Sequence, residues 1–253
     1  MVNPAVPPVA ADLASLSLDG SVALVTGGTR GIGLAATIGL ATLGATVVMV
    51  GRSAPQAEAV ARDLVARGLD VVGIAADVSD PDAVRALPAQ LGVLAAPDLL
   101  VCAAGVMSAP TAKTLRTEQQ EWDRVIGVNL TGVFTTVATF GPAMTARRSG
   151  RVVVLSACLG RMSGPGTAGG LAPYRISKAA VNALVRNLAH ETGLGARGVS
   201  VDAVCPGHCR TDMGGADAPR SAEQGADSVL WLCTREQITP TGLLWEDRTV
   251  VDW

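Results

Sequence analysis

The sequence predicts an α/β fold, built as one doubly wound parallel sheet with helices on both faces. Three observations support this prediction. Short apolar, β-branched segments alternate with longer helical stretches along the chain. A glycine-rich turn joins the first strand to the first helix. The 253 residues suffice for one sizeable hydrophobic core, and neither a domain linker nor an internal repeat interrupts them.

The first unit is a strand, a turn, a helix and a second strand. Residues 22–25 are a short apolar run, and the helical stretch that follows continues to about Leu43, where Gly44 ends it. Residues 46–50 are rich in β-branched side chains and form the second strand. This order is a βαβ unit, which favours parallel pairing of the two strands.

The turn inside this unit reads Thr26-Gly27-Gly28-Thr29-Arg30-Gly31-Ile32-Gly33. Gly27 lets the chain leave the strand sharply, Gly31 lets the backbone approach a pyrophosphate, and Gly33 lets the helix pack close to the sheet. The N–H groups at the helix N-terminus then face the phosphates. An ordinary glycine-rich turn is the alternative, but the two flanking strands favour a dinucleotide-binding site.

The end of the second strand indicates which dinucleotide binds. A carboxylate there would accept the 2′-hydroxyl of NAD, but the strand continues into Gly51-Arg52-Ser53 without an acid. Arg30 lies in the glycine turn as well, and two guanidinium groups fit a 2′-phosphate through charge-assisted hydrogen bonds. We therefore predict NADP(H) in preference to NAD(H). The alternative is that both arginines are solvated surface charges.

The alternation continues to the C-terminus. Helices are expected at residues 56–67, 81–90, 117–147, 174–193 and 221–232, and strands at 71–75, 99–103, 151–155, 200–204 and 242–245, with a turn at 246–248 and a final segment at 249–253. Thr117 with Gln120 and Ser221 with Gln224 are expected to form capping boxes. About seven strands result, in the order 3-2-1-4-5-6-7 of a Rossmann-type sheet.

Composition excludes several classes of function. The net charge is −2 and no basic block is present, so nothing indicates nucleic-acid binding. The five cysteines are odd in number, and no second Cys/His pair completes a zinc set with Cys205 and Cys209. Buried thiols in a reducing, cytoplasmic compartment and no metal site are therefore expected.

Two long uncharged stretches, residues 31–51 and 125–146, have the length of a membrane span. The first changes from a helical to a β-branched pattern at Gly44, and the second contains Asn129 and Pro142, so we interpret both as buried elements of a core. Residues 1–18 are proline-rich without a basic n-region, which predicts a flexible tail rather than a signal peptide. Residues 19–253 then form the single domain.

The sole tyrosine of the chain, Tyr174, lies four positions before Lys178, one of only two lysines among eighteen arginines. On a helix the two side chains share a face. An ammonium is a compact charge that can hold down the pKa of a neighbouring phenol. An isolated Tyr-x-x-x-Lys pair is more often a surface tyrosine beside a solvated charge, so the pair gains meaning only from the rest of the chain.

Together these features resemble the short-chain dehydrogenase/reductase family, from about Asp19 to the C-terminus. The matching motifs are Thr26-Gly27-x3-Gly31-x-Gly33, Asp77-Val78, Ala104-Gly105, Asn129, Tyr174-x3-Lys178 and Pro206-Gly207-x3-Thr211. Each is weak alone, but their order and spacing are specific. The segments Gly150-Arg151-Val152-Val153-Val154 and Tyr174-Arg175-Ile176-Ser177-Lys178, with the terminal Trp253, are most similar to the carbonyl-reductase branch.

The resemblance implies roles for individual residues. Tyr174 would be the general acid, and Lys178 would lower its pKa and hold the nicotinamide ribose. Asn129 would support a water that relays protons to Lys178, although a helix asparagine bonded to backbone is an equally simple reading. The implied cofactor-binding residues are Gly27, Thr29, Arg30, Gly31, Ile32, Gly33, Arg52, Ser53, Asp77, Val78, Ala103, Ala104, Gly105, Asn129, Tyr174, Lys178, Pro206, Gly207, His208, Thr211 and Met213.

Three departures from the family pattern put the site in question. Cys102-Ala103-Ala104-Gly105 replaces Asn-Asn-Ala-Gly, so polar tethering there must be weaker or replaced. The serine that usually binds the substrate carbonyl corresponds to Ala157, which leaves Ser156 as the candidate donor and Ser163 as a weaker one. The loop before Tyr174 is longer than the usual spacing. Candidates to line the substrate pocket are Arg161, Met162, Leu171, Pro173, His208 and Met213.

The resemblance therefore implies an NADPH-dependent oxidoreductase that reduces a ketone or aldehyde by hydride transfer, with Tyr174 as general acid. The alternatives are an NADP-dependent secondary-alcohol dehydrogenase and a dinucleotide-binding protein with weak or no turnover, which the alanine at 157 suggests. A homodimer or homotetramer is expected through the Asn129 and Tyr174 helices, with Trp253 at another contact. Neither a nucleic-acid nor a membrane partner is expected.

Overall fold

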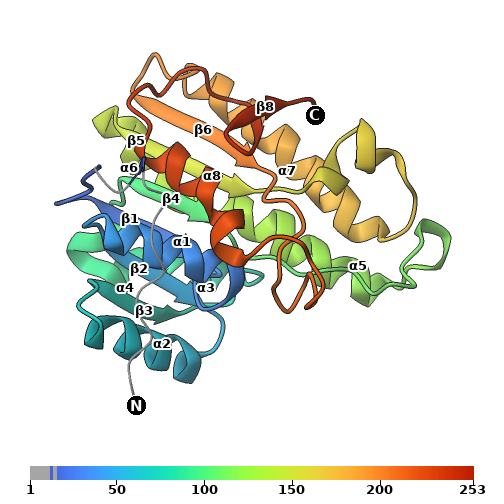
Figure 1. Ribbon diagram of the computed structural model, residues 1–253, viewed down its shortest axis with the longest axis horizontal. Helices are drawn as coiled ribbons and strands as arrows, with labels where there is room; N and C mark the ends of the chain where they lie inside the picture. The colour runs from blue at the N-terminus through green and yellow to red at the C-terminus, as the bar shows by residue number, and fades with distance from the viewer. Residues whose placement is uncertain (1–11, 14–15) are drawn as a thin grey trace.

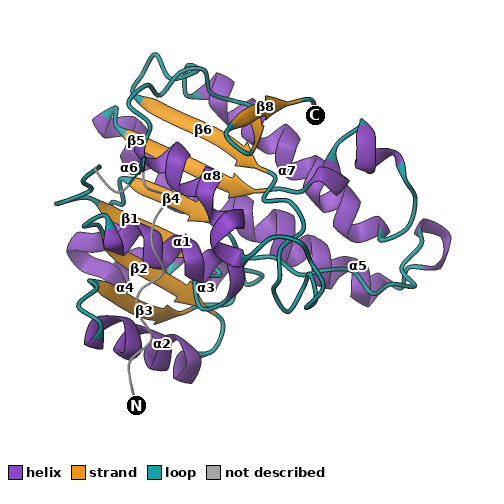
Figure 2. Cartoon of the chain, in the orientation of Figure 1, coloured by secondary structure: helices purple, strands orange, loops and turns teal. Residues whose placement is uncertain are grey.

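The computed structural model describes residues 12–13 and 16–253. Its strands form one eight-stranded sheet in the order β3-β2-β1-β4-β5-β6-β7-β8, with helices on both faces (Figure 1, Figure 2). The strands are β1 (Val22–Thr26), β2 (Thr46–Gly51), β3 (Val71–Ala75), β4 (Leu99–Cys102), β5 (Gly150–Leu155), β6 (Val199–Val204), β7 (Leu244–Glu246) and β8 (Thr249–Val251). The predicted doubly wound α/β fold is confirmed.

The helices alternate with the strands, as the sequence pattern indicates. They are α1 (Gly31–Thr42), α2 (Ala54–Ala66), α3 (Pro81–Arg85), α4 (Leu87–Leu91), α5 (Gln119–Ile126), α6 (Gly132–Arg147), α7 (Ala172–Glu191) and α8 (Ala222–Thr234). Short helical turns of the 3₁₀ type are η1 (Gly92–Ala95), η2 (Thr114–Arg116), η4 (Cys158–Gly160) and η5 (Gly164–Thr167), and η3 (Gly127–Thr131) is a π-helical turn.

Strands β1 to β7 pair in parallel, and β8 adds an antiparallel edge strand that exceeds the predicted seven. A hairpin joins β7 to β8. Asp247 and Arg248 both have positive φ, 48° and 60°, as the type I′ turn of a two-residue hairpin requires. The predicted turn at this place therefore reverses the chain tightly enough for the last segment to pair with β7.

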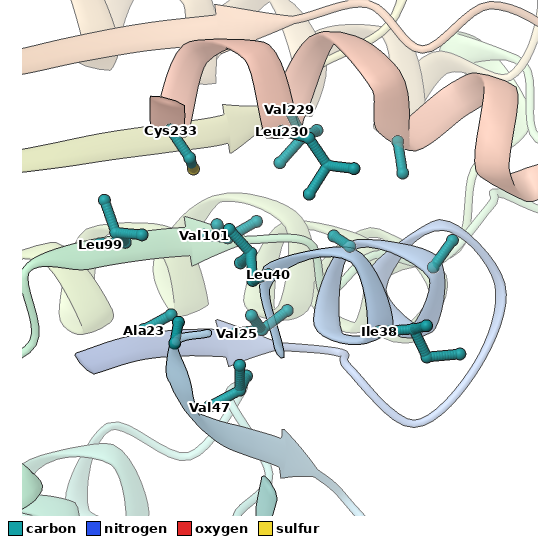
Figure 3. Packing of buried hydrophobic residues seen from close by; sticks show 14 of the residues in the cluster. Ala23, Val25, Ile38, Leu40, Val47, Leu99, Val101, Val229, Leu230 and Cys233 are labelled. Atoms are coloured by element: carbon teal, nitrogen blue, oxygen red, sulfur yellow. The ribbon is translucent and has the colours of Figure 1, made fainter. Parts of the chain in front are cut away.

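Two hydrophobic clusters cover the two faces of the sheet. On one face α1 and α8 pack over β1, β2 and β4, where Leu40 and Leu230 meet Val25 and Val101 (Figure 3). On the other face α6 and α7 pack over the same sheet through side chains such as Phe140. Because both faces are covered, the central strands read as continuous apolar runs.

Two predicted helices differ in detail. The helix expected at 81–90 is divided into α3 and α4, because Pro88 lacks the N–H that would continue the α3 ladder. The capping box Ser221/Gln224 is confirmed, but the box Thr117/Gln120 is wrong. Thr117 Oγ1 instead donates to Lys113 O at 2.9 Å, and α5 begins one residue later than such a box requires, with Glu118 as its N-cap.

The helical segment Gln119–Arg147 is the one candidate span, by length and composition, among the described residues. Core helices of soluble proteins pass the same test, and Phe140 and Met144 of this segment are fully enclosed in the second cluster. Most of the predicted tail, residues 1–11 and 14–15, lies outside the described residues. Of the rest, Leu13 is buried in the first cluster and Asp12 pairs with Arg248.

Candidate active site

A cavity of about 750 Å³ opens at the carboxyl ends of the parallel strands. In Figure 1 these ends all lie on one side of the sheet, together with the loop after β6. The strand order reverses between β1 and β4, and ligands of doubly wound sheets bind at that reversal. The cavity therefore lies where the topology itself predicts a binding site.

The structure brings nearly all predicted site residues to this cavity. The lining includes every predicted cofactor residue except Asn129, and it also includes Ser156, Ala157 and Cys158. Of the predicted substrate-wall residues, His208 and Met213 line the cavity, but Arg161, Met162, Leu171 and Pro173 do not. Met162 points to solvent with 78% of its surface exposed, and the Arg161 guanidinium instead lies 3.7 Å from Glu246.

The glycine turn fits a dinucleotide pyrophosphate. Gly27 has φ +68° and approaches the chain after β4 so closely that a Cβ would lie 2.6 Å from Ala104 Cα. A Cβ on Gly33 would lie 2.2 Å from the Gly27 carbonyl oxygen, so only glycine allows α1 to start here. Arg30 at the N-cap of α1 makes no side-chain cap, and the first turn holds no acid. The N–H groups of α1 therefore remain free to bind an anion.

Two arginines, Arg30 and Arg52, line the cavity. Arg52 follows β2 and is exposed on the cavity wall. Arg30 Nη1 donates to Asp212 Oδ2 at 2.7 Å, so the glycine turn is tied to the loop after β6. Both the backbone N–H and the hydroxyl group of Ser79 donate to Asp77 Oδ1. Asp77, the first acid after β3, thus serves a local turn, and the arginines supply the positive charge of this wall.

Tyr174 is positioned by a distant loop. Its backbone N–H, in the first turn of α7, donates to Ser108 Oγ at 2.8 Å, and Ser108 is itself buried. Leu171 at the N-cap has φ +50° and offers no side-chain cap. Ser108 therefore replaces the missing cap from sixty-six positions away. Sequence patterns did not reveal Ser108, because its loop has no periodicity.

Tyr174 and Lys178 lie together on the cavity wall, with Lys178 Nζ 5.8 Å from the ring centre. Burial raises the pKa of Tyr174 above its usual value, and the sulfurs of Cys158 and Cys205 raise it further. Burial also lowers the pKa of Lys178 to about 8. Lys178 Nζ donates to Leu155 O at 2.7 Å. The expected acidifying effect of the ammonium on the phenol is therefore not found, because burial and the two sulfurs set the direction of the Tyr174 pKa shift.

Asn129 is fully buried in the π-helical turn η3 and does not line the cavity. Its side chain binds both backbone groups of Val106 and donates to Ser177 Oγ at 3.0 Å. This amide tethers the chain after β4, where the family asparagines are replaced by Cys102 and Ala103. A π-turn often marks a functional place in a helix.

The hydroxyl group of Ser156 is bonded to groups of α7. Its Oγ donates to Asn182 Oδ1 at 2.5 Å and lies 3.4 Å from Lys178 O. The prediction that Ser156 binds a substrate carbonyl gains no support from this orientation. Ala157 packs against Tyr174, and the next residue, Cys158, adds a thiol to the same wall.

Comparison with known proteins agrees with this geometry. The short chain dehydrogenase family model matches residues 21–222. The 3-oxoacyl-[acyl-carrier-protein] reductase FabG of Staphylococcus aureus is 39% identical over 207 residues, 80% of each chain. A 3-oxoacyl-[acyl-carrier protein] reductase of Brucella melitensis with bound NAD has a TM-score of 0.81 at 29% identity, covering 91% of this chain and 90% of that one.

A second solved structure is similar and contains the other cofactor. It is a Beutenbergia cavernae protein, proposed to be an NAD(P)-dependent gluconate 5-dehydrogenase, with bound NADP. Its TM-score is 0.81 at 29% identity, covering 91% of this chain and 96% of that one. Similar structures thus contain either cofactor, and none of these relatives specifies the carbonyl-reductase branch.

Proposed function

This chain belongs to the short-chain dehydrogenase/reductase family of oxidoreductases, and from this premise we propose that it is an NADPH-dependent reductase of ketones or aldehydes. The observation that best supports this proposal is the Tyr174–Lys178 pair on the wall of a cavity that the glycine turn also lines. A chain with a single tyrosine and two lysines places one of each there.

The cavity has the parts that a nicotinamide dinucleotide requires. The free N–H groups of α1 would bind the pyrophosphate, and Asp77 and Val78 would flank the adenine. Thr211 and the Pro206-Gly207 turn would hold the carboxamide end, and Lys178 the ribose beside it. The bound cofactor supplies the hydride.

Tyr174 would supply the proton. Because its pKa is raised, the phenol is protonated at neutral pH and can donate to a carbonyl oxygen as negative charge develops there. Lys178, with a pKa lowered to about 8, still carries most of its charge near pH 7 and stabilises the phenolate that remains.

Arg30 and Arg52 support the preference for NADP(H). Both line the cavity, and no acid stands at the end of β2 to accept a ribose hydroxyl. Turnover of one substrate with NADPH and with NADH tests this, with Arg52→Gln as the variant that should lose the preference. Faster turnover with NADH in the parent protein would contradict it.

The substrate panel follows from the relatives. The Staphylococcus aureus protein is named for reduction of a 3-oxoacyl group on a carrier protein, so 3-oxoacyl thioesters belong in the panel beside simple ketones and aldehydes. We expect Tyr174→Phe to bind NADPH normally and to reduce the best substrate about 10²–10⁴-fold more slowly. Equal rates for the variant and the parent protein would refute the assignment of Tyr174.

A binding protein with weak or no turnover is the second candidate, because Ala157 lacks a hydroxyl and Ser156 is bonded to Asn182. Cofactor binding measured by fluorescence, together with the panel, separates the two: such a protein binds NADPH yet consumes none with any carbonyl. Oxidation of secondary alcohols with NADP⁺ is the third candidate, and the same assay run in reverse measures it.

We also propose that the protein is a cytoplasmic homodimer or homotetramer, as the family resemblance implies. On the α5–α6 and α7 surfaces, Phe134 and Ile176 are large apolar side chains that remain exposed, at 54% and 41%. Light scattering at working concentration tests the assembly, and Phe134→Glu should shift it toward the monomer. A monomeric parent protein would contradict the proposal.

A further inference from the structure

Two thiols meet at the ends of two neighbouring strands. Strands β5 and β6 pair in parallel, with Leu155 opposite Val204, and Ser156 N donates to Val204 O at 2.7 Å. Cys205 follows β6 directly, and Cys158 opens the turn η4 just after β5. Cys205 lies in the second hydrophobic cluster and Cys158 packs against that cluster, and the two side chains lie close enough to shift each other's pKa. The fold therefore pairs two cysteines that are far apart in the sequence.

The two sulfurs differ in their access to solvent. Cys158 is half-buried and lines the cavity, whereas Cys205 is only 2% exposed and lies in the second core cluster. A small oxidant that enters the cavity therefore meets Cys158 first. Cys205 lies behind it, within reach of the first sulfur.

The surrounding charges place the thiolate on Cys158. Cys205 is the main group that holds the pKa of Cys158 well below its usual value, assisted by the Leu159 N–H and Arg161 and opposed by burial and Glu246. The pKa of Cys205 is raised, because Cys158, burial and Glu246 all disfavour a second negative charge. Cys205 Sγ donates to Glu246 Oε1 at 3.5 Å, so the buried thiol is held in its protonated form.

The ionisable residues of α7 on the same cavity wall are Tyr174 and Lys178. Tyr174 is neutral at neutral pH, and Lys178 Nζ is bonded to Leu155 O. Neither is among the groups that shift Cys158, so the thiolate depends on Cys205, the turn η4 and Arg161.

We propose that Cys158 is a peroxide-reactive thiol in the cavity wall, and that Cys205 resolves its oxidised form as a Cys158–Cys205 disulfide. The Cys158 thiolate attacks hydrogen peroxide, the O–O bond breaks, and with one proton the products are a Cys158 sulfenic acid and water. The Cys205 thiol then displaces the hydroxyl group, which leaves as a second water when the S–S bond forms. Hydrogen peroxide is the oxidant, and a dithiol reductant returns the Cys158–Cys205 disulfide to two thiols.

Selective alkylation of the wild-type protein tests the first half of the proposal. Cys209 is the matched control, because it lines the same cavity but has a raised pKa and bonds Pro206 O at 3.2 Å. With limiting iodoacetamide near neutral pH we expect Cys158 to react at least about fivefold faster than Cys209, since a larger thiolate fraction outweighs its lower intrinsic nucleophilicity. The midpoint of its rate–pH profile should lie at least about one pH unit below the ~8.5 of a free thiol. Labelling of Cys209 first, or a midpoint at or above that of a free thiol, would overturn the assignment.

Peptide mapping after hydrogen peroxide tests the second half. We expect one disulfide, joining Cys158 to Cys205, with the loss of two hydrogens in intact mass and full reversal by dithiothreitol. In Cys205→Ala the Cys158 sulfenic acid should persist and be trapped by dimedone, whereas Cys209→Ala should still form the disulfide. A different disulfide, or oxidation of Cys158 to sulfinic acid with Cys205 unchanged in the wild-type protein, would refute the resolving role. Peptide mapping and intact mass of the wild-type protein report the state of the thiols. They therefore test the proposal without a reductase assay and without the Cys205→Ala variant.

Discussion

Ser108 Oγ lies 2.8 Å from the backbone nitrogen of Tyr174 and accepts its hydrogen bond. The serine lies in the loop after β4 and the tyrosine in the first turn of α7, so one contact joins two walls of the cavity. Both residues are buried, at 3% and 6% exposure. The position of the only phenol in the chain therefore depends on a hydroxyl group that is remote in the sequence.

Removing that hydroxyl should loosen Tyr174. In Ser108→Ala the buried N–H of Tyr174 loses its acceptor, and we expect the free energy of unfolding to fall by about 1–2 kcal/mol. A displaced phenol should also lower kcat by about tenfold, because proton transfer requires a short, aligned contact. Urea unfolding and steady-state kinetics measure the two effects. Ser149→Ala, at an exposed loop position, is the control, and equal results for both variants would contradict the role of Ser108.

We expect the buried charge of Lys178 to destabilise the folded protein. Burial lowers its pKa to about 8, so between pH 8 and its usual 10.5 the unfolded chain binds the extra proton and stability rises with pH. Below pH 8 the full penalty is present. We expect the free energy of unfolding of Lys178→Met to be about 1–2 kcal/mol higher than that of the parent protein near neutral pH. The substitution removes a burial penalty of about 3 kcal/mol, which is partly offset by the lost bond to Leu155 O.

The stabilising effect of Lys178→Met should shrink in urea unfolding at about pH 9.5, where the parent protein has escaped most of the penalty. Carbonyl reduction should be lost in the same variant. A variant that is less stable than the parent protein at both pH values would show that Lys178 is held as a net stabilising charge.

Ala157 stands where a hydroxyl donor is usual in the family, and replacing it tests whether the site is complete. It packs against Tyr174 on the cavity wall, so a hydroxyl group introduced there would lie beside the phenol. We expect Ala157→Ser to raise kcat/KM for carbonyl reduction by about 10–10³-fold, the range of a single oxyanion-type donor. Ala168→Ser makes the same change at an exposed loop position and serves as control. No gain in Ala157→Ser would mean that another group already binds the carbonyl.

Asp212 competes for Arg30. Both side chains are well exposed, at 61% and 76%, so their ion pair contributes no more than about 1 kcal/mol. We expect Asp212→Asn to free the guanidinium for a 2′-phosphate and to lower the Kd of NADPH by about two- to fivefold. The Kd of NADH should stay unchanged. Calorimetric titration of both cofactors measures this, and an equal change for both would show that Arg30 contacts the shared pyrophosphate instead.

Arg235 and Asp202 form a buried ion pair behind β7. Arg235 Nη2 lies 3.0 Å from Asp202 Oδ2, and its guanidinium lies over both the Trp231 and Trp245 rings, 5.3 and 5.0 Å from ring centres that are 5.0 Å apart. Arg235→Met leaves the carboxylate buried without its charge partner and should cost about 3–5 kcal/mol of unfolding free energy. Adding Asp202→Asn should recover about 1–3 kcal/mol. Urea unfolding of both variants tests this, and a double variant no better than the single one would contradict the pairing.

The sequence by itself determined the fold class, the glycine turn and the Tyr174–Lys178 pair. All three follow from local patterns: alternating strand and helix periodicity, the glycine spacing of the first turn, and the shared face of a helix at spacing four. The extra strand β8 and the failed Thr117 cap show the limit, since each depends on one or two backbone angles.

Only the tertiary structure decided how the site is held together and which groups are free to react. The cap from Ser108, the orientation of Ser156 toward Asn182 and the proximity of Cys158 to Cys205 each join residues that are 26 to 66 positions apart. Burial, which also reversed the expected direction of the Tyr174 pKa shift, depends on neighbours that no local pattern encodes. Local periodicity therefore specifies the scaffold, whereas the charge and hydrogen bonding of the site arise from long-range packing.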